Sequence, residues 1–211
     1  MSKTIVFQGD SITDAGSSTT GQRRDANESM GSGYPFLTMA LLREAEPEKD
    51  WQVYNRGIRG DRIVDLYARW KRDVLNLSPD ILSILIGVND TAHEIQMRNG
   101  VDVPRYVQFY RMLLEWTKKA LPETKIVLME PFVLQFGMVE SNWLPEMDAR
   151  REAVKSLSDE FHTVFIPLQT ILNEAKKRAP QEYWLRDGVH PTPAGHHLFA
   201  KTWIEATKAI R

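Results

Sequence analysis

The chain contains 211 residues, of which 42% are hydrophobic and 26% are charged, and its formal net charge is -1. A chain of this length suits one or two domains, and without repeats or low-complexity tracts we expect a single domain over residues 1–211. The balanced charge provides no basic field that would attract nucleic acid or an anionic membrane. The absence of Cys excludes disulfides, thiolate metal sites and a Cys nucleophile.

The N-terminus carries no targeting pattern. The apolar stretch Thr4–Phe7 is too short for the core of a signal peptide, and no small-residue cleavage site follows it. No window approaches the roughly 20 apolar residues that a membrane span needs. We therefore expect a cytoplasmic protein with no membrane partner.

Short apolar runs alternate with segments of helical periodicity along the chain. Strands are expected at five of these runs, Thr4–Gln8, Gln52–Tyr54, Ile81–Ile86, Lys125–Met129 and Thr163–Ile166. Helices are expected over Tyr34–Ala45, Ile63–Trp70, Val103–Leu114, Pro145–Glu160, Leu168–Ala179 and Pro193–Ile210. The least regular stretches are 15–32, 91–101 and 131–144.

Continuous apolar runs are typical of strands that are buried on both faces of a parallel sheet. Their alternation with helices predicts an α/β fold, a doubly wound, flavodoxin-like three-layer sandwich with a five-stranded parallel sheet. Right-handed crossovers then place helices on both faces. In such open sheets, sites form beyond the carboxyl ends of the strands, so the residues that follow each strand are the candidates for chemistry.

Two polar, glycine-containing segments follow the first two strands. Gly9–Asp10–Ser11 can turn sharply and project the Ser11 hydroxyl outward, as a nucleophile requires. The same residues also suit a helix N-cap or a plain turn. The segment 55–61 contains Gly57 and Gly60 and can point its amides at a ligand, or it can be a simple turn.

Two further segments carry an amide and an imidazole. Asn89 follows the third strand and can donate to a developing negative charge, although Asn–Asp also suits a turn that caps a helix. Near the C-terminus, Asp187 lies three residues before His190. Such an Asp can bond one imidazole nitrogen and so prepare the other to act as a base. Alone, this pair is also compatible with a surface turn.

In their order along the chain, these segments resemble the four blocks of the GDSL-type, or SGNH, hydrolase family. The matching positions are Gly9–Ser11, Gly60, Gly87–Asp90 and Asp187–His190. The resemblance spans Ile5 to His190. It departs from the common pattern at Arg59, where small residues are frequent in similar proteins.

The resemblance implies a serine esterase that needs no metal or organic cofactor. Ser11 would be the nucleophile, His190 the general base and Asp187 the residue that orients the imidazole. The oxyanion hole would consist of the Ser11 and Gly60 backbone amides and the Asn89 side chain. The remaining histidines are expected to be surface or structural residues, and they are His93, His162, His196 and His197.

Four short runs of the sequence look most like the intracellular bacterial acetylxylan-esterase-type members of that family. They are Gly9–Asp14, Gly31–Tyr34, Asn55–Gly60 and Asp187–Pro191. This likeness implies a small-molecule ester as partner, an acetylated sugar or xylo-oligosaccharide. Arg59 could contact substrate or pair with Asp61 or Asp10, and aromatic rings near the expected rim could stack on sugar faces. The candidate substrate-binding residues are therefore Asp10, Arg59, Trp143, Tyr183 and Trp184.

Two other functions stay open at this point. The same scaffold serves lysophospholipases and thioesterases, which prefer longer acyl chains. A non-catalytic flavodoxin-like protein is the second alternative, with Ser11–Thr13 and Ser17–Thr20 binding a phosphate after the first strand. Similar acetyl esterases often assemble, so the rim aromatics could instead belong to a homo-oligomer interface.

Overall fold

The computed structural model describes residues 2–17 and 30–211. Five strands form one parallel sheet in the order β2-β1-β3-β4-β5. They are β1 (Lys3–Gly9), β2 (Trp51–Asn55), β3 (Ile81–Leu85), β4 (Lys125–Met129) and β5 (Val164–Ile166). The predicted five-stranded parallel sheet is confirmed.

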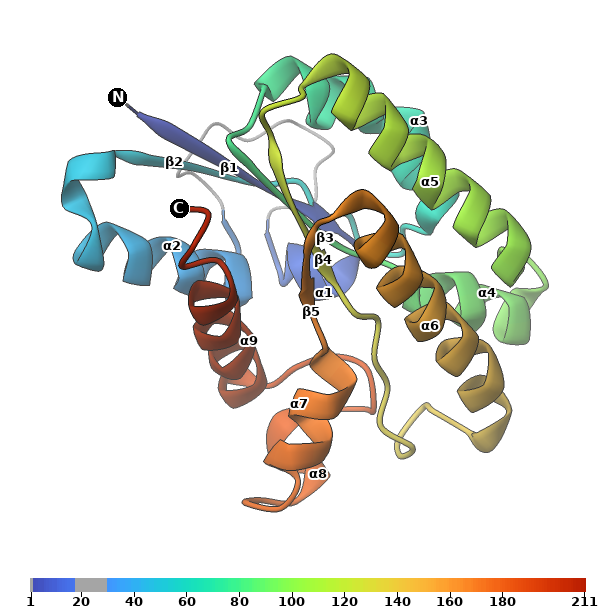
Figure 1. The fold of residues 1–211 in the computed structure, drawn as a ribbon. Coiled ribbons are helices and arrows are strands. Elements are labelled where there is room, and N and C mark those ends of the chain that lie inside the picture. The colour runs from blue at the N-terminus through green and yellow to red at the C-terminus, as the bar shows by residue number, and fades with distance from the viewer. Residues whose placement is uncertain (1, 18–29) are drawn as a thin grey trace.

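Helices cover both faces of this sheet (Figure 1), which confirms the doubly wound three-layer sandwich. One face carries α2 (Tyr34–Ala45), α7 (Leu168–Ala175) and α9 (Pro193–Ala206). The other carries α3 (Ile63–Asp73), α5 (Val103–Ala120) and α6 (Leu144–Phe161). The other helical segments in the described part of the chain are α1 (Ser11–Asp14), α4 (Val88–Met97), α8 (Gln181–Trp184), η1 (Pro47–Lys49), η2 (Leu75–Leu77) and η3 (Ser141–Trp143).

Strand β1 is apolar throughout its centre because both of its faces are buried. Successive side chains of a strand point to opposite faces. Ile5 and Phe7 therefore join the cluster under α2 and α9, and the Phe7 ring centroid lies 5.5 Å from that of Tyr34 and 5.3 Å from that of Trp203. Val6, between them, packs into the cluster under α3 and α5.

The order of the strands creates a crevice beside β1. The chain runs from β1 to β2 on one side and then returns to β3 on the other side of β1. The crossover after β1 and the crossover after β2 therefore run in opposite directions along the sheet. In such a sheet, the loops beyond the carboxyl ends of β1 and β3 diverge at this point. The segments that follow β1, β2 and β3 all reach this edge of the sheet.

The prediction of an irregular stretch over 91–101 is wrong for most of its length, because α4 occupies Val88–Met97. This helix buries only Val88, Asp90, Thr91 and Ala92, a set that includes two polar residues. It therefore lacks the apolar stripe by which amphipathic helices are recognised in a sequence. Of the other irregular stretch, 15–32, residues 18–29 lie outside the described part of the chain.

Helix ends differ from the expectations by a few residues. Helix α7 ends at Ala175 and α9 at Ala206, four residues earlier than expected in each case. Both α7 and α9 continue into turns, whose local periodicity resembles that of a helix.

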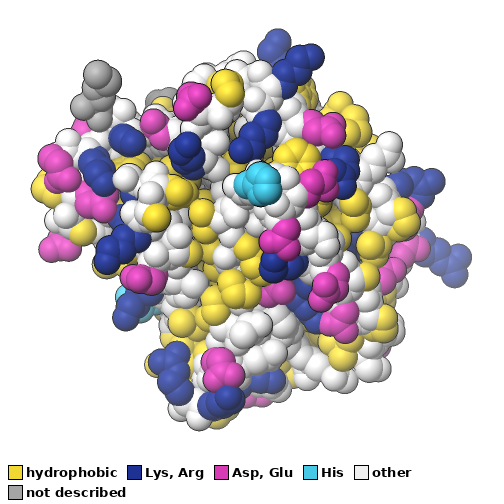
Figure 2. Space-filling view, in the orientation of Figure 1, with side chains coloured by type: hydrophobic (Ala, Val, Ile, Leu, Met, Phe, Trp, Pro, Cys, Tyr) yellow, Lys and Arg dark blue, Asp and Glu magenta, His cyan; other side chains and the backbone are white. Residues whose placement is uncertain are grey.

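Charges of both signs are interspersed on the face of the molecule shown in Figure 2, in keeping with the net charge of -1. Within residues 2–17 and 30–211, no helix is long and apolar enough to cross a membrane.

Candidate active site

Ser11 lies at the start of a one-turn helix directly after β1. The Asp10 carboxylate caps this turn by accepting a hydrogen bond from the Ile12 amide at 2.9 Å. Gly9 permits the turn because a Cβ there would lie 2.4 Å from the Leu85 carbonyl oxygen, closer than atoms can pack. The turn therefore holds the half-buried Ser11 at the carboxyl edge of the sheet.

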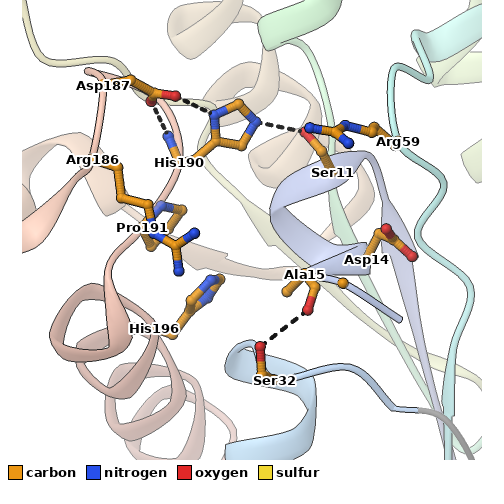
Figure 3. A pocket seen from close by; sticks show the side chains of 11 residues that line it. Ser11, Asp14, Ala15, Ser32, Arg59, Arg186, Asp187, His190, Pro191 and His196 are labelled. Atoms are coloured by element: carbon orange, nitrogen blue, oxygen red, sulfur yellow. Dashed lines mark hydrogen bonds and ion pairs between the residues drawn. The ribbon is translucent and has the colours of Figure 1, made fainter. Parts of the chain in front are cut away.

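His190 reaches Ser11 from the segment between α8 and α9. Its Nε2 atom lies 3.0 Å from the Ser11 Oγ atom. Its Nδ1 atom lies 2.8 Å from Oδ2 of Asp187. When Nδ1 carries the proton and donates it to the carboxylate, Nε2 is left with a lone pair that can accept the Ser11 hydroxyl proton (Figure 3).

Asp187 is held in place by its own backbone neighbours. Its Oδ1 atom accepts hydrogen bonds from the Val189 amide at 3.0 Å and the His190 amide at 2.8 Å. Partial burial raises the pKa of Asp187, but these bonds and the His190 ring outweigh it and bring the pKa below its ordinary value. Gly188 allows the tight loop with φ of 92°, and a Cβ there would lie 2.4 Å from the Phe136 carbonyl oxygen.

The loop after β2 lies against the Ser11 turn. The Ile58 amide donates to the Gly9 carbonyl at 3.0 Å. Farther along this loop, Asn89 Nδ2 donates to the Asp61 carbonyl at 3.0 Å, which ties α4 to the residue after Gly60. Among the described residues, the backbone amides of Ser11 and Gly60 donate to no acceptor, so both stay available to a ligand.

Arg69, on α3, binds this loop through its guanidinium group. Its guanidinium donates to the Gly9 carbonyl at 3.3 Å and to the Arg56 carbonyl at 2.7 Å. It also pairs with Asp61 at 2.8 Å and with Asp73 at 3.1 Å. One buried side chain thus joins the end of β1 to the loop that carries Gly60.

Three carboxyl groups lie beneath the same region, those of Asp10 and Asp90 being buried and that of Asp61 half-buried. Burial raises the pKa of Asp10 to about 7 and that of Asp90 to about 7. Burial also raises the pKa of Asp61 to about 6, despite its ion pair with Arg69. The Asp90 carboxylate accepts from the Ile63 amide at 3.1 Å, whereas Oδ2 of Asp10 has no hydrogen-bond partner among the described residues.

A cavity of about 420 Å³ opens over Ser11. This volume lies within the range of small-ligand sites, about 300–1,000 Å³. The side chains that dominate its lining are Ser11, Asp187, His190, Arg59, Arg186 and His196. Among the described residues, no group of three or more His, Asp or Glu side chains is arranged to hold a metal ion.

Several cavity residues are not among the candidates of the sequence analysis, and His196 and Arg186 are two of them. His196 is buried in α9, and its Nδ1 accepts from the Tyr34 amide at 3.2 Å. Desolvation, with smaller contributions from Arg186 and His190, lowers the pKa of His196 to about 4. The sequence does not indicate which of the adjacent residues His196 and His197 faces a site. The position of Arg186 next to Asp187, by contrast, indicates that Arg186 lies near the site.

Of the five candidate substrate-binding residues, only Arg59 lines the cavity. Trp143 and Asp10 are 2% and 1% exposed, so neither has surface to offer a sugar. Trp184 is 7% exposed and covered by Arg178, which lies 4.9 Å from its ring centroid. Tyr183 is 57% exposed but lies outside the cavity lining. Trp143 and Trp184 turn inward because burial of their large apolar area is favourable.

The likeness to known proteins extends over nearly the whole chain. The model of the GDSL-like Lipase/Acylhydrolase family matches residues 7–198. An acetylxylan esterase from Geobacillus stearothermophilus is 32% identical over 205 residues, which cover 95% of this chain and 91% of that protein.

Solved structures give the same result. A crystal structure described as a GDSL-like lipase from Parabacteroides merdae superimposes with a TM-score of 0.92 and 42% identity, covering 100% of this chain and 98% of that one. The crystal structure of an acetylxylan esterase from Geobacillus stearothermophilus has a TM-score of 0.86 and 31% identity, covering 97% of this chain and 93% of that one.

Proposed function

This chain belongs to the GDSL-like lipase/acylhydrolase family and is a carboxylic ester hydrolase, and we propose that Ser11, His190 and Asp187 are its catalytic triad and an acetylated carbohydrate its substrate. The observation that carries the triad is the chain of contacts from Ser11 Oγ to His190 Nε2 at 3.0 Å and from His190 Nδ1 to Asp187 at 2.8 Å. Membership in a family of ester hydrolases argues against the alternative of a non-catalytic flavodoxin-like protein. Part of the phosphate site considered there, residues 18–20, lies outside the described residues.

In the first half of the reaction, Ser11 Oγ attacks the ester carbonyl carbon while His190 Nε2 takes the hydroxyl proton. The negatively charged Asp187 stabilises the resulting imidazolium. The tetrahedral intermediate collapses when His190 gives the proton to the leaving alcohol oxygen, which leaves an acyl group on Ser11. In the second half, water attacks this acyl group while one of its protons passes to His190 Nε2. The bond between the acyl carbon and Ser11 Oγ then breaks as His190 returns the proton to Oγ, and the carboxylic acid is released.

The negative charge on the carbonyl oxygen needs donors that are already in place. We propose the Ser11 amide, the Gly60 amide and Asn89 Nδ2 for this role. The two amides are not engaged by other described groups. Asn89 uses one of its two amide hydrogens on the Asp61 carbonyl, so the other remains for the oxyanion.

The acetyl specificity rests on likeness to the Geobacillus stearothermophilus acetylxylan esterase. A lysophospholipase or thioesterase on the same scaffold would turn over long acyl chains better. Initial rates on 4-nitrophenyl acetate, butyrate and octanoate separate the two, and we expect a decline from acetate onward. Acetate release from acetylated xylo-oligosaccharides then tests the carbohydrate.

The triad is tested by Ser11→Ala on 4-nitrophenyl acetate. We expect kcat to fall by about 10⁴-fold or more with the thermal melt retained, because the nucleophile is lost while the fold is not. Ser156→Ala, at an exposed position on α6, is the matched control. Unchanged turnover in Ser11→Ala would exclude this hydroxyl as the nucleophile.

A further inference from the structure

Two arginines line the cavity over Ser11 although they come from distant parts of the chain. Arg59 lies in the loop after β2, next to Gly60, and Arg186 directly precedes Asp187. Figure 3 shows the Arg186 side chain reaching down between His190 and His196, and Arg59 on the side of the cavity where Ser11 lies. Two positive charges therefore flank the place where an ester would react.

Neither guanidinium is neutralised by a residue that the structure describes. Among the described residues, neither Arg59 nor Arg186 forms an ion pair or a side-chain hydrogen bond, and both are exposed. This differs from the nearby arginines of the loop support, since Arg62 pairs with Asp65 and Arg69 with Asp61.

The carboxylates that share the cavity are already engaged. Asp187 accepts from the Val189 and His190 amides and from the His190 ring. Asp14 is buried and accepts a hydrogen bond from the Ser17 hydroxyl. His196, buried beside Arg186, accepts from the Tyr34 amide and is neutral at neutral pH, since burial lowers its pKa to about 4. The two arginines are thus the cationic groups that the described cavity offers to a ligand.

We propose that the natural substrate is an acetylated sugar that carries an anionic substituent, a sugar acid whose carboxylate is bound by Arg59 and Arg186. This inference rests on the proposed function, because it places the anion on the alcohol side of the ester that Ser11 attacks. A planar guanidinium presents paired N–H donors that match a carboxylate. A neutral sugar can accept hydrogen bonds from a guanidinium but does not neutralise its charge.

The test compares three substrates that share one ring and the same three acetyl positions, namely per-O-acetylated methyl 6-deoxyglucoside as the neutral glucoside, methyl glucuronide and methyl glucoside 6-phosphate. Full acetylation removes any effect of regioselectivity, and acetate release gives kcat/KM for each. We expect the glucuronide to exceed the neutral glucoside by about tenfold, the worth of one or two partly exposed charge-assisted contacts. A larger gain for the phosphate would assign the site to phosphorylated sugars and overturn the carboxylate.

The arginines are tested through the same ratio of anionic to neutral kcat/KM. We expect Arg59→Gln and Arg186→Gln each to lower the ratio, and the double variant to bring it close to one. Because the ratio is taken within one protein sample, partial loss of folding does not alter it. Arg98→Gln, at an exposed position at the end of α4, is the matched control and should keep the wild-type ratio.

Salt gives an independent measurement on the wild-type protein. The preference for the anionic substrate should shrink as NaCl rises from 0.02 to 0.5 M, because exposed charges are screened. A wild-type ratio near one, or a double variant with the wild-type ratio, would overturn the inference. If the same sample still hydrolyses 4-nitrophenyl acetate, the esterase activity is retained and only the inference about anionic substrates fails. If the sample does not hydrolyse 4-nitrophenyl acetate either, the esterase function is contradicted as well.

Discussion

The Nε2 atom of His190 lies 3.0 Å from the Oγ atom of Ser11, although the two residues are 179 positions apart in the chain. The first residue is held at the end of β1 and the second in a loop that leads into α9. Their distance is therefore set by the packing of α9 against the sheet and by the Asp187 carboxylate that bonds the His190 ring.

Asp187→Asn should impair the chemical step far more than binding. The amide cannot stabilise an imidazolium by charge and does not enforce a proton on Nδ1, so His190 Nε2 is less available as a base. We expect kcat on 4-nitrophenyl acetate to fall by about 10³–10⁴-fold with KM within a few-fold. Asp159→Asn, at an exposed carboxylate on α6 that pairs with Lys155, is the control. An effect confined to KM would contradict the orienting role.

Asn89→Ala should expose the contribution of one oxyanion donor. Loss of such a donor lowers kcat by about 10²–10³-fold in other hydrolases, because the charge on oxygen exists only in the transition state. Asn89→Asp should be slower still, since a carboxylate adds negative charge at the same place. Steady-state kinetics with 4-nitrophenyl acetate measure both variants. A change in kcat of less than about threefold for Asn89→Ala would remove this side chain from the oxyanion hole.

Arg69→Met should lower both stability and turnover. The change leaves the Asp61 carboxylate and the Gly9 carbonyl without their guanidinium donor, and breaking a buried ion pair typically costs about 3–5 kcal/mol. Denaturant unfolding measures the loss. Arg72→Met is a matched control because Arg72 also pairs with Asp73 but is 52% exposed, so its loss should cost less than about 1 kcal/mol. Equal losses in both variants would contradict a special role for Arg69.

The stability of the protein should depend on pH through Asp10. Burial raises the pKa of Asp10 in the folded state to about 7, above the ordinary value of 3.8, so the folded state keeps the proton that the unfolded state loses. The stabilising contribution of the neutral carboxyl is complete below about pH 4 and is lost as the pH rises toward 7. We therefore expect the free energy of unfolding to fall across this window.

Asp10→Asn removes this titration, so the decline between pH 4 and pH 8 should shrink by an amount on the order of 2–4 kcal/mol. Asp90 and Asp61 still titrate, and some decline should remain. Urea unfolding at half-unit steps of pH gives the comparison, with the exposed Asp50→Asn as the control. An identical pH profile for Asp10→Asn and wild type would show that Asp10 is not the group responsible.

Much of the architecture could be predicted because its cause is local. A strand buried on both faces must be apolar at successive positions, and β3 is such a run from Ile81 to Leu85. Helix α4 was not predicted, because it buries few apolar residues and its pattern therefore resembles that of a loop. The single-domain organisation and the catalytic roles of Ser11, His190 and Asp187 stay predictions, although the three side chains are in contact.

The candidate substrate residues show where local reasoning ends. Trp143 and Trp184 were selected for their place in the chain, yet both rings are buried against their own surroundings. Arg186 and His196 line the cavity, and neither was selected. Which side chain of a loop turns inward depends on packing partners that are remote in the chain, and no pattern of neighbouring residues records them.

The order of the residues was sufficient to specify the strands, the layers and the four segments that meet beyond them, because periodicity and turn chemistry act over a few neighbours. The distances within the site, the engagement of Asp14 and Asp187, and the exposure of Arg59 and Arg186 arise from the folded chain alone. These properties depend on contacts between segments that only folding brings together.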